Sequence, residues 1–115
     1  METIKGYKGL NTFKVLSEKE CGNDNKIYLV DCGNDFYGYG TIQDLQSISF
    51  VSVDRCGTKE ELFNHCNLIA EMCRKNIQKY NDFISSDKTK GWEFLIQHEQ
   101  EELDMLTEFA SVLSK

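Results

Sequence analysis

The segment from Asn34 to Thr41 contains three aromatic residues and two glycines, and its composition suits the binding of a small molecule. The aromatic side chains of Phe36, Tyr37 and Tyr39 could stack on a nucleotide base or another flat ring. The glycines between them leave backbone N–H groups accessible for polar contacts. Ordinary packing in a strand, with the glycines at a bend or bulge, is the alternative interpretation of the same pattern.

The sequence contains two arginines, and either could bind the anionic part of such a ligand. Arg55 lies where the last predicted strand meets the first long helix, and Arg74 lies within that helix. A surface ion pair is the more ordinary role for each of them. The residues that we predict to bind a ligand are Asn34, Asp35, Phe36, Tyr37, Tyr39, Thr41, Arg55 and Arg74.

The two histidines each lie four residues from a glutamate, in the pairs Glu61–His65 and His98–Glu102. Di-iron helical bundles need a glutamate three residues before each histidine, and leucine occupies that position in both cases here. The five cysteines form no Cys-x-x-Cys pair, and we expect them to be reduced and to pack as small apolar residues. The sequence therefore predicts neither a metal site nor a cofactor.

Motifs of catalysis are also missing from the sequence. It has no Gly-x-Ser-x-Gly elbow, no phosphate-binding P-loop and no complete dinucleotide fingerprint. Gly38-Tyr39-Gly40 matches only the first half of such a fingerprint and lies inside a predicted strand. We therefore predict no catalytic residues and expect a protein that is not an enzyme.

Charge and hydropathy narrow the range of partners. The 115 residues include 13 basic and 19 acidic ones, for a formal net charge of −6. Nucleic-acid binding normally needs a clustered basic surface, so we expect no such partner. No apolar run approaches the roughly 20 residues of a membrane span, and the N-terminus does not read as a secretory signal. These features predict a cytoplasmic protein without membrane contact.

The first half of the chain is rich in strand signals. Strands are predicted over residues 12–16, 26–32, 36–42 and 47–53, with a weaker edge strand or loop over 3–10. Asn- and Gly-rich turns separate them, and a short helical turn fits between Thr41 and Gln46. These lengths favour an antiparallel sheet of about four strands.

The second half changes to a helical period. Apolar residues recur every three or four positions over residues 58–85 and again over 90–114. A capping box at Thr58 and Glu61 marks the first helix start. We predict a single α+β domain over residues 1–115, with a β-rich part (1–57) followed by a two-helix hairpin (58–115).

Two helices of this length carry more apolar surface than a sheet of short strands can cover. We therefore predict a homo-oligomer that forms through the long helices, because soluble oligomers are usually symmetric assemblies of one chain. Glu99 interrupts the apolar stripe of the second helix. The apolar residues that this prediction leaves uncovered are Leu103, Leu106, Phe109, Ala110, Val112 and Leu113.

The sheet-then-hairpin layout, with residues 6–13 (GYKGLNTF) and 35–41 (DFYGYGT), resembles the phage Thoeris anti-defence sponge proteins of the first type. The resemblance implies a non-enzymatic protein that sequesters a cyclic ADP-ribose-type immune signal at subunit interfaces. It also implies that a phage-encoded chain would act in the cytoplasm of the host cell. The scarcity of arginine and the negative net charge depart from what an anionic ligand favours.

An acidic run on the second helix supports a different function. Five acidic residues lie between Glu99 and Glu108, and no lysine or arginine lies between Gly91 and Ser114. Such a helix face could dock a basic protein, as an immunity protein or an anti-CRISPR inhibitor would. A protein-binding inhibitor is therefore the alternative to a nucleotide sponge.

Overall fold

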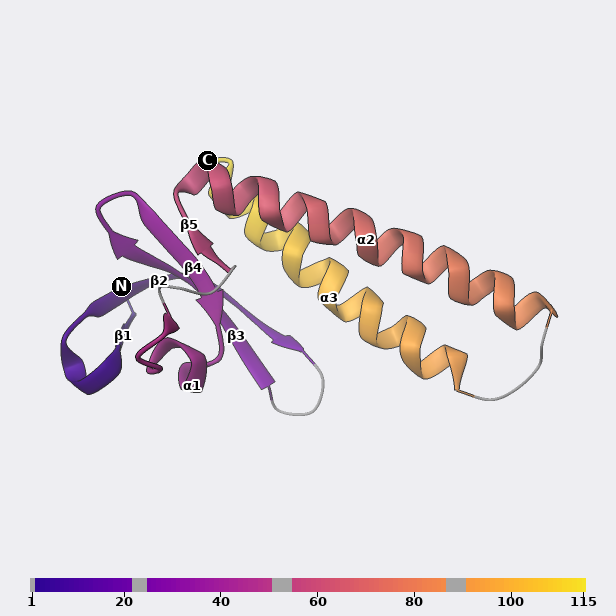
Figure 1. The fold of residues 1–115 in the computed structure, drawn as a ribbon, viewed down its shortest axis with the longest axis horizontal. Helices are drawn as coiled ribbons and strands as arrows, with labels where there is room; N and C mark the ends of the chain where they lie inside the picture. Colours follow the sequence, from indigo (N-terminus) through magenta and orange to yellow (C-terminus); the bar gives the residue numbers. More distant parts are fainter. Residues whose placement is uncertain (1, 22–24, 51–54, 87–90) are drawn as a thin grey trace.

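The computed structural model describes residues 2–21, 25–50, 55–86 and 91–115. The N-terminal half forms a five-stranded antiparallel sheet in which each strand pairs with its neighbours in sequence (Figure 1). Two long helices follow, so the predicted α+β architecture is confirmed. The strands are β1 (Thr3–Lys5), β2 (Thr12–Cys21), β3 (Asn25–Gly33), β4 (Phe36–Gly40) and β5 (Cys56–Gly57).

The tight turn between β3 and β4 depends on residues that tolerate left-handed backbone conformations. Asn34 and Asp35 have φ angles of 56° and 57°, and the preceding Gly33 has a φ of 88°. The Gly33 N–H also donates a hydrogen bond to Oδ1 of Asp31 at 2.8 Å. Asparagine, aspartate and glycine adopt these φ values at lower cost than other residues, and this explains why the sequence turns here.

One predicted strand is wrong. Residues 47–50 form turns after α1 (Ile42–Leu45), in which Ser47 N–H bonds to Asp44 O at 3.1 Å and Phe50 N–H to Ser47 O at 3.2 Å. The alternating pattern reflects a turn that places Phe50 in the core and Ile48 at the surface. The rest of that prediction, residues 51–53, lies outside the described residues.

The two helices begin close to their predicted starts. α2 (Lys59–Ser86) carries the predicted capping box, because the Glu61 N–H bonds to Thr58 Oγ1 and the Thr58 N–H bonds to Glu61 Oε1, each at 3.2 Å. α3 (Trp92–Leu113) returns antiparallel beside it (Figure 1). Among the described residues, no helix is long and apolar enough to cross a membrane.

Successive residues of β3 point to opposite faces of the sheet and enter two separate cores. Leu29 joins the core between the sheet and the two long helices, together with Leu62, Leu106 and Phe109. Tyr28 and Val30 join a second core on the other face, where α1 packs. The second core consists of Ile4, Phe13, Tyr28, Val30, Leu45 and Phe50.

The apolar stripe near the end of α3 is covered within a single chain. Leu106, Phe109, Ala110 and Leu113 are buried, and their neighbours Leu103 and Val112 pack against the same core. The expectation that a second copy of the chain is needed to cover these residues is therefore wrong.

The end of α2 and the start of α3 project beyond the sheet as a tip (Figure 1). The molecule is therefore elongated, with dimensions of 52 × 26 × 24 Å. Near this tip the Trp92 ring lies 5.7 Å from Tyr80 and 5.0 Å from Phe83, measured between ring centroids. These aromatic contacts join α2 to the start of α3 where no strand lies beneath them.

Candidate functional site

A cleft of about 500 Å³ lies between one end of the sheet and the middle of α3. One wall comes from the start of β3, the end of β4 and the residue before β5, and the other wall comes from α3. Apolar side chains lie beside a cation and two carboxylates. The lining residues are Asn25, Ile27, Tyr39, Thr41, Arg55, His98, Glu101, Glu102 and Met105.

Arg55 supplies the positive charge of the cleft. Its Nη1 lies 3.4 Å from Oδ2 of Asp44, and its guanidinium carbon lies 5.9 Å from the centre of the Tyr39 ring. Its backbone oxygen accepts a hydrogen bond from the Tyr39 N–H at 3.3 Å. The side chain remains 38% exposed, so the guanidinium is held in place and still faces solvent.

Thr41 caps α1 and fixes the carboxylate that holds Arg55. The Asp44 N–H donates to Thr41 Oγ1 at 3.1 Å, and the Thr41 N–H donates to Asp44 Oδ2 at 3.0 Å. Burial raises the pKa of Asp44, but the hydrogen bonds with Thr41 and the charge of Arg55 outweigh it and hold the pKa below its usual value. Asp44 therefore stays ionised and positions the arginine.

Tyr39 connects the cleft to the core. Its side chain is buried, its ring lies 5.8 Å from that of Phe109, and its hydroxyl lies 3.3 Å from Nε2 of His65. Burial raises the pKa of the Tyr39 hydroxyl, the nearby Cys66 adds to the effect, and Arg55 opposes it. The phenol is therefore neutral, and Tyr39 lines the cleft in this form.

The other predicted ligand-binding residues lie elsewhere. Asn34 and Asp35 form the turn at the opposite end of β4, and Phe36 and Tyr37 are the half-buried first residues of that strand. Arg74 is exposed on α2 and pairs with Glu71 at 3.2 Å. Of the eight predicted residues, the structure thus brings three to the cleft: Tyr39, Thr41 and Arg55.

Sequence reasoning did not predict the helical wall of the cleft. His98, Glu101, Glu102 and Met105 reach it because α3 folds back over the sheet. A hint was present in the sequence, since 98, 101, 102 and 105 are spaced three and four apart and therefore share one side of a helix. Nothing local in the sequence indicated that this side faces β4.

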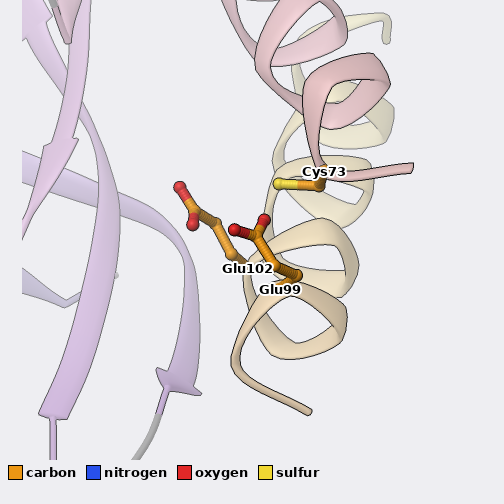
Figure 2. A group of neighbouring side chains, drawn as sticks. All are labelled: Cys73, Glu99 and Glu102. Atoms are coloured by element: carbon orange, nitrogen blue, oxygen red, sulfur yellow. The ribbon is translucent and has the colours of Figure 1, made fainter. Parts of the chain in front are cut away.

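A second group of polar side chains lies where α2 and α3 meet. Cys73 projects from α2 toward Glu99 and Glu102 of α3 (Figure 2), and one donor atom from each residue lies within 4.8 Å of the other two. Cys73 is 2% exposed, and the two glutamates are half-buried. Oε1 of Glu99 also accepts a hydrogen bond from Nδ2 of Asn76 at 3.3 Å.

The described cysteines, Cys32, Cys56, Cys66 and Cys73, are all free, and the side chain of Cys21 lies outside the described residues. Burial raises the pKa of Cys66 to about 11. The pKa of Cys73 rises to about 12 because of burial, a hydrogen bond with Glu99 and the charge of Glu102. Both thiols are therefore protonated at neutral pH.

Comparisons of the chain with protein-family models, with curated protein sequences and with solved structures found no match in any of the three. Function is therefore inferred below from the chemistry of the cleft.

Proposed function

We propose that this chain is a non-enzymatic binding protein that sequesters a small nucleotide of the cyclic ADP-ribose type in the cleft beside Arg55. The supporting observation is that Tyr39, Thr41 and Arg55, from separate parts of the sequence, line one cavity of about 500 Å³. That volume falls within the roughly 300–1,000 Å³ of typical small-molecule sites.

The side chains on the two walls complement different parts of such a ligand. A guanidinium has five N–H donors, so the contact of Arg55 with Asp44 leaves others for a phosphate. Glu101 and Glu102 can accept hydrogen bonds from ribose hydroxyls. Ile27 and Met105 supply apolar surface for a base. This pairing of a cation with carboxylates fits a ligand that carries both phosphate and hydroxyl groups, as a nucleotide does.

The acidic wall also bears on the alternative function. Glu101 and Glu102 belong to the acidic run that could dock a basic protein, but both line the cleft. Exposed acidic residues remain on α3 at Glu93, Asp104 and Glu108, and Glu108 lies 3.6 Å from Lys19 of β2. An acidic docking face is therefore smaller than the sequence implied, and we favour the nucleotide.

We also propose that the working unit is a homo-oligomer formed through the long helices, although by a different surface from the one first predicted. Leu68 and Met72 are 62% and 51% exposed on α2. Their spacing from His65, three and seven residues, places them on the same side of the helix as the residue that contacts Tyr39. A second copy of the chain that covered these two residues would therefore lie next to the histidine that contacts Tyr39 of the cleft.

Calorimetric titration with cyclic ADP-ribose isomers tests the binding proposal. We expect one isomer to bind, and we expect Arg55→Gln to weaken binding by at least about tenfold, because a charged hydrogen bond contributes about 1.5–3 kcal/mol. Arg74→Gln is the matched control, since Arg74 lies outside the cleft, and it should bind like the unchanged chain.

The bound molecule should be recovered chemically intact after the protein is denatured. If no isomer releases heat on titration, or if the recovered ligand has been altered, the proposal of non-enzymatic sequestration is wrong. Equal losses in the Arg55 and Arg74 variants would place the ligand elsewhere on the molecule.

A further inference from the structure

We propose that Cys73, Glu99 and Glu102 form a binding site for a zinc-like divalent cation between α2 and α3. The three residues supply one sulfur and two carboxylate oxygens from two helices, and these atoms lie within 4.8 Å of one another. Glu102 also belongs to the His98–Glu102 pair of the sequence, but the other two donors here are Cys73 and Glu99 and not a histidine.

The arrangement resembles metal sites in helical bundles in two respects. Glu99 and Glu102 are three residues apart on α3, so both project from one side of the helix toward α2. Cys73 faces them from α2 (Figure 2). Zinc holds sulfur at about 2.3 Å and carboxylate oxygen at about 2.0–2.2 Å. Closing around an ion therefore needs a contraction on the order of 1 Å, which rotation of the flexible glutamate side chains can supply.

The placement of the buried Cys73 thiol beside two carboxylates is the first reason to expect a ligand. Cys73 is 2% exposed, and the hydrogen-bond partner that it has among the described residues, Glu99, is itself one of the three donors. Cys66, one heptad earlier on α2, and Cys73 both belong to the apolar core between the sheet and the long helices. The thiol of Cys73 also lies beside two carboxylates, those of Glu99 and Glu102 (Figure 2).

The charges of Glu99 and Glu102 give a second reason to expect a cation at this site. Within the part of the chain that the structure describes, no lysine or arginine forms an ion pair with Glu99 or Glu102. Two half-buried carboxylates this close repel each other unless a proton or a cation lies between them. A divalent ion would offset their charges and could take a water molecule in its fourth coordination position.

Asn76 provides outer support for the site. Its Nδ2 donates a hydrogen bond to Oε1 of Glu99 at 3.3 Å, which holds the carboxylate toward Cys73. Hydrogen bonds of this kind orient metal ligands, and their loss typically lowers affinity about 10–100-fold. The asparagine therefore belongs to the proposed site although it would not touch the ion.

Cobalt(II) added to the full-length, reduced chain is the probe, because its thiolate complexes absorb in the near ultraviolet and its tetrahedral complexes absorb strongly in the visible. We expect both signals to saturate at one ion per chain and to disappear when zinc is added. Cys73→Ala should abolish the thiolate absorption. Cys66→Ala, which removes an equally buried thiol from the same helix, should leave it unchanged.

The glutamates are tested by Glu99→Gln, which keeps the side-chain shape and should weaken binding by at least about tenfold. Arg55→Gln should leave cobalt binding unchanged, so a failed nucleotide titration and a failed metal titration remain distinguishable. Circular dichroism checks that each variant folds, and if Cys73→Ala does not, the Glu99 variant decides. The proposal is wrong if the unchanged chain gives no cobalt signals. It is also wrong if the thiolate signal persists in Cys73→Ala, or if Glu99→Gln binds cobalt with unchanged affinity.

Discussion

Cys66 shows how burial changes the chemistry of a single side chain in this fold. It is fully buried in the core shared by α2, α3 and the sheet, and its pKa rises from an ordinary 9.0 to about 11. The fold therefore favours the neutral thiol. The stability that this gives is complete below pH 9 and is lost as the pH rises from 9 toward 11, because the unfolded chain releases the proton first.

We therefore predict that the free energy of unfolding falls with pH above 9, by up to about 1.4 kcal/mol per pH unit for each such thiol. Cys66→Ala should make this dependence shallower, as measured by urea denaturation at several pH values. Leu62→Ala is the control, because Leu62 is buried in the same core as Cys66 and has no titratable group. That control should lower stability equally at every pH, and an unchanged slope in Cys66→Ala would contradict the prediction.

The candidate site could be predicted from the sequence only in part. Aromatic–glycine patterning pointed to Tyr39 and Thr41, and a position at the sheet–helix junction pointed to Arg55. The same pattern also included Asn34 and Asp35, which the turn at the other end of β4 carries away from the cleft. β4 is five residues long, so the residues before it and the residues at its end lie at opposite ends of the sheet. Residues that are close in sequence therefore belong to different surfaces of the molecule.

At the scale of elements, the long helices were predicted well because their period persists over many residues. The sequence did not predict the two-residue strand β5, because β5 depends on its pairing with β4. It also did not predict the turns over residues 47–50, because they depend on the burial of Phe50 in the core. The pairing of Cys73 with Glu99 was missed for the same reason. It depends on the alignment of α2 with α3, which no local pattern encodes.

The projecting tip of the hairpin should be less stable than the rest of the molecule, because no strand covers it (Figure 1). Trp92 is the single tryptophan of the chain and lies at this tip, against Tyr80 and Phe83. We predict that tryptophan fluorescence changes at a lower urea concentration than far-ultraviolet circular dichroism. Coincident transitions would show that the tip unfolds together with the sheet.

At the scale of the whole molecule, the exposed apolar residues of α2 carry the expectation of self-association. We predict that light scattering gives a mass above the 13.3 kDa of one chain, and that Leu68→Glu with Met72→Glu reduces the mass to that of a monomer. Ile48→Glu is the matched control, because Ile48 is 73% exposed but lies after α1, away from the long helices. A monomeric unchanged chain would refute the proposal.

The nearest-neighbour order of the sheet has a consequence for how quickly the chain folds. Every strand pairs with a strand adjacent in sequence, and α2 packs on α3, which follows it directly. Pairings between neighbours in sequence close short loops, and such local contacts are associated with fast folding. The chain also contains no proline, so refolding cannot be delayed by prolyl isomerisation. A freshly synthesised chain should therefore reach its folded form without a slow kinetic phase caused by proline.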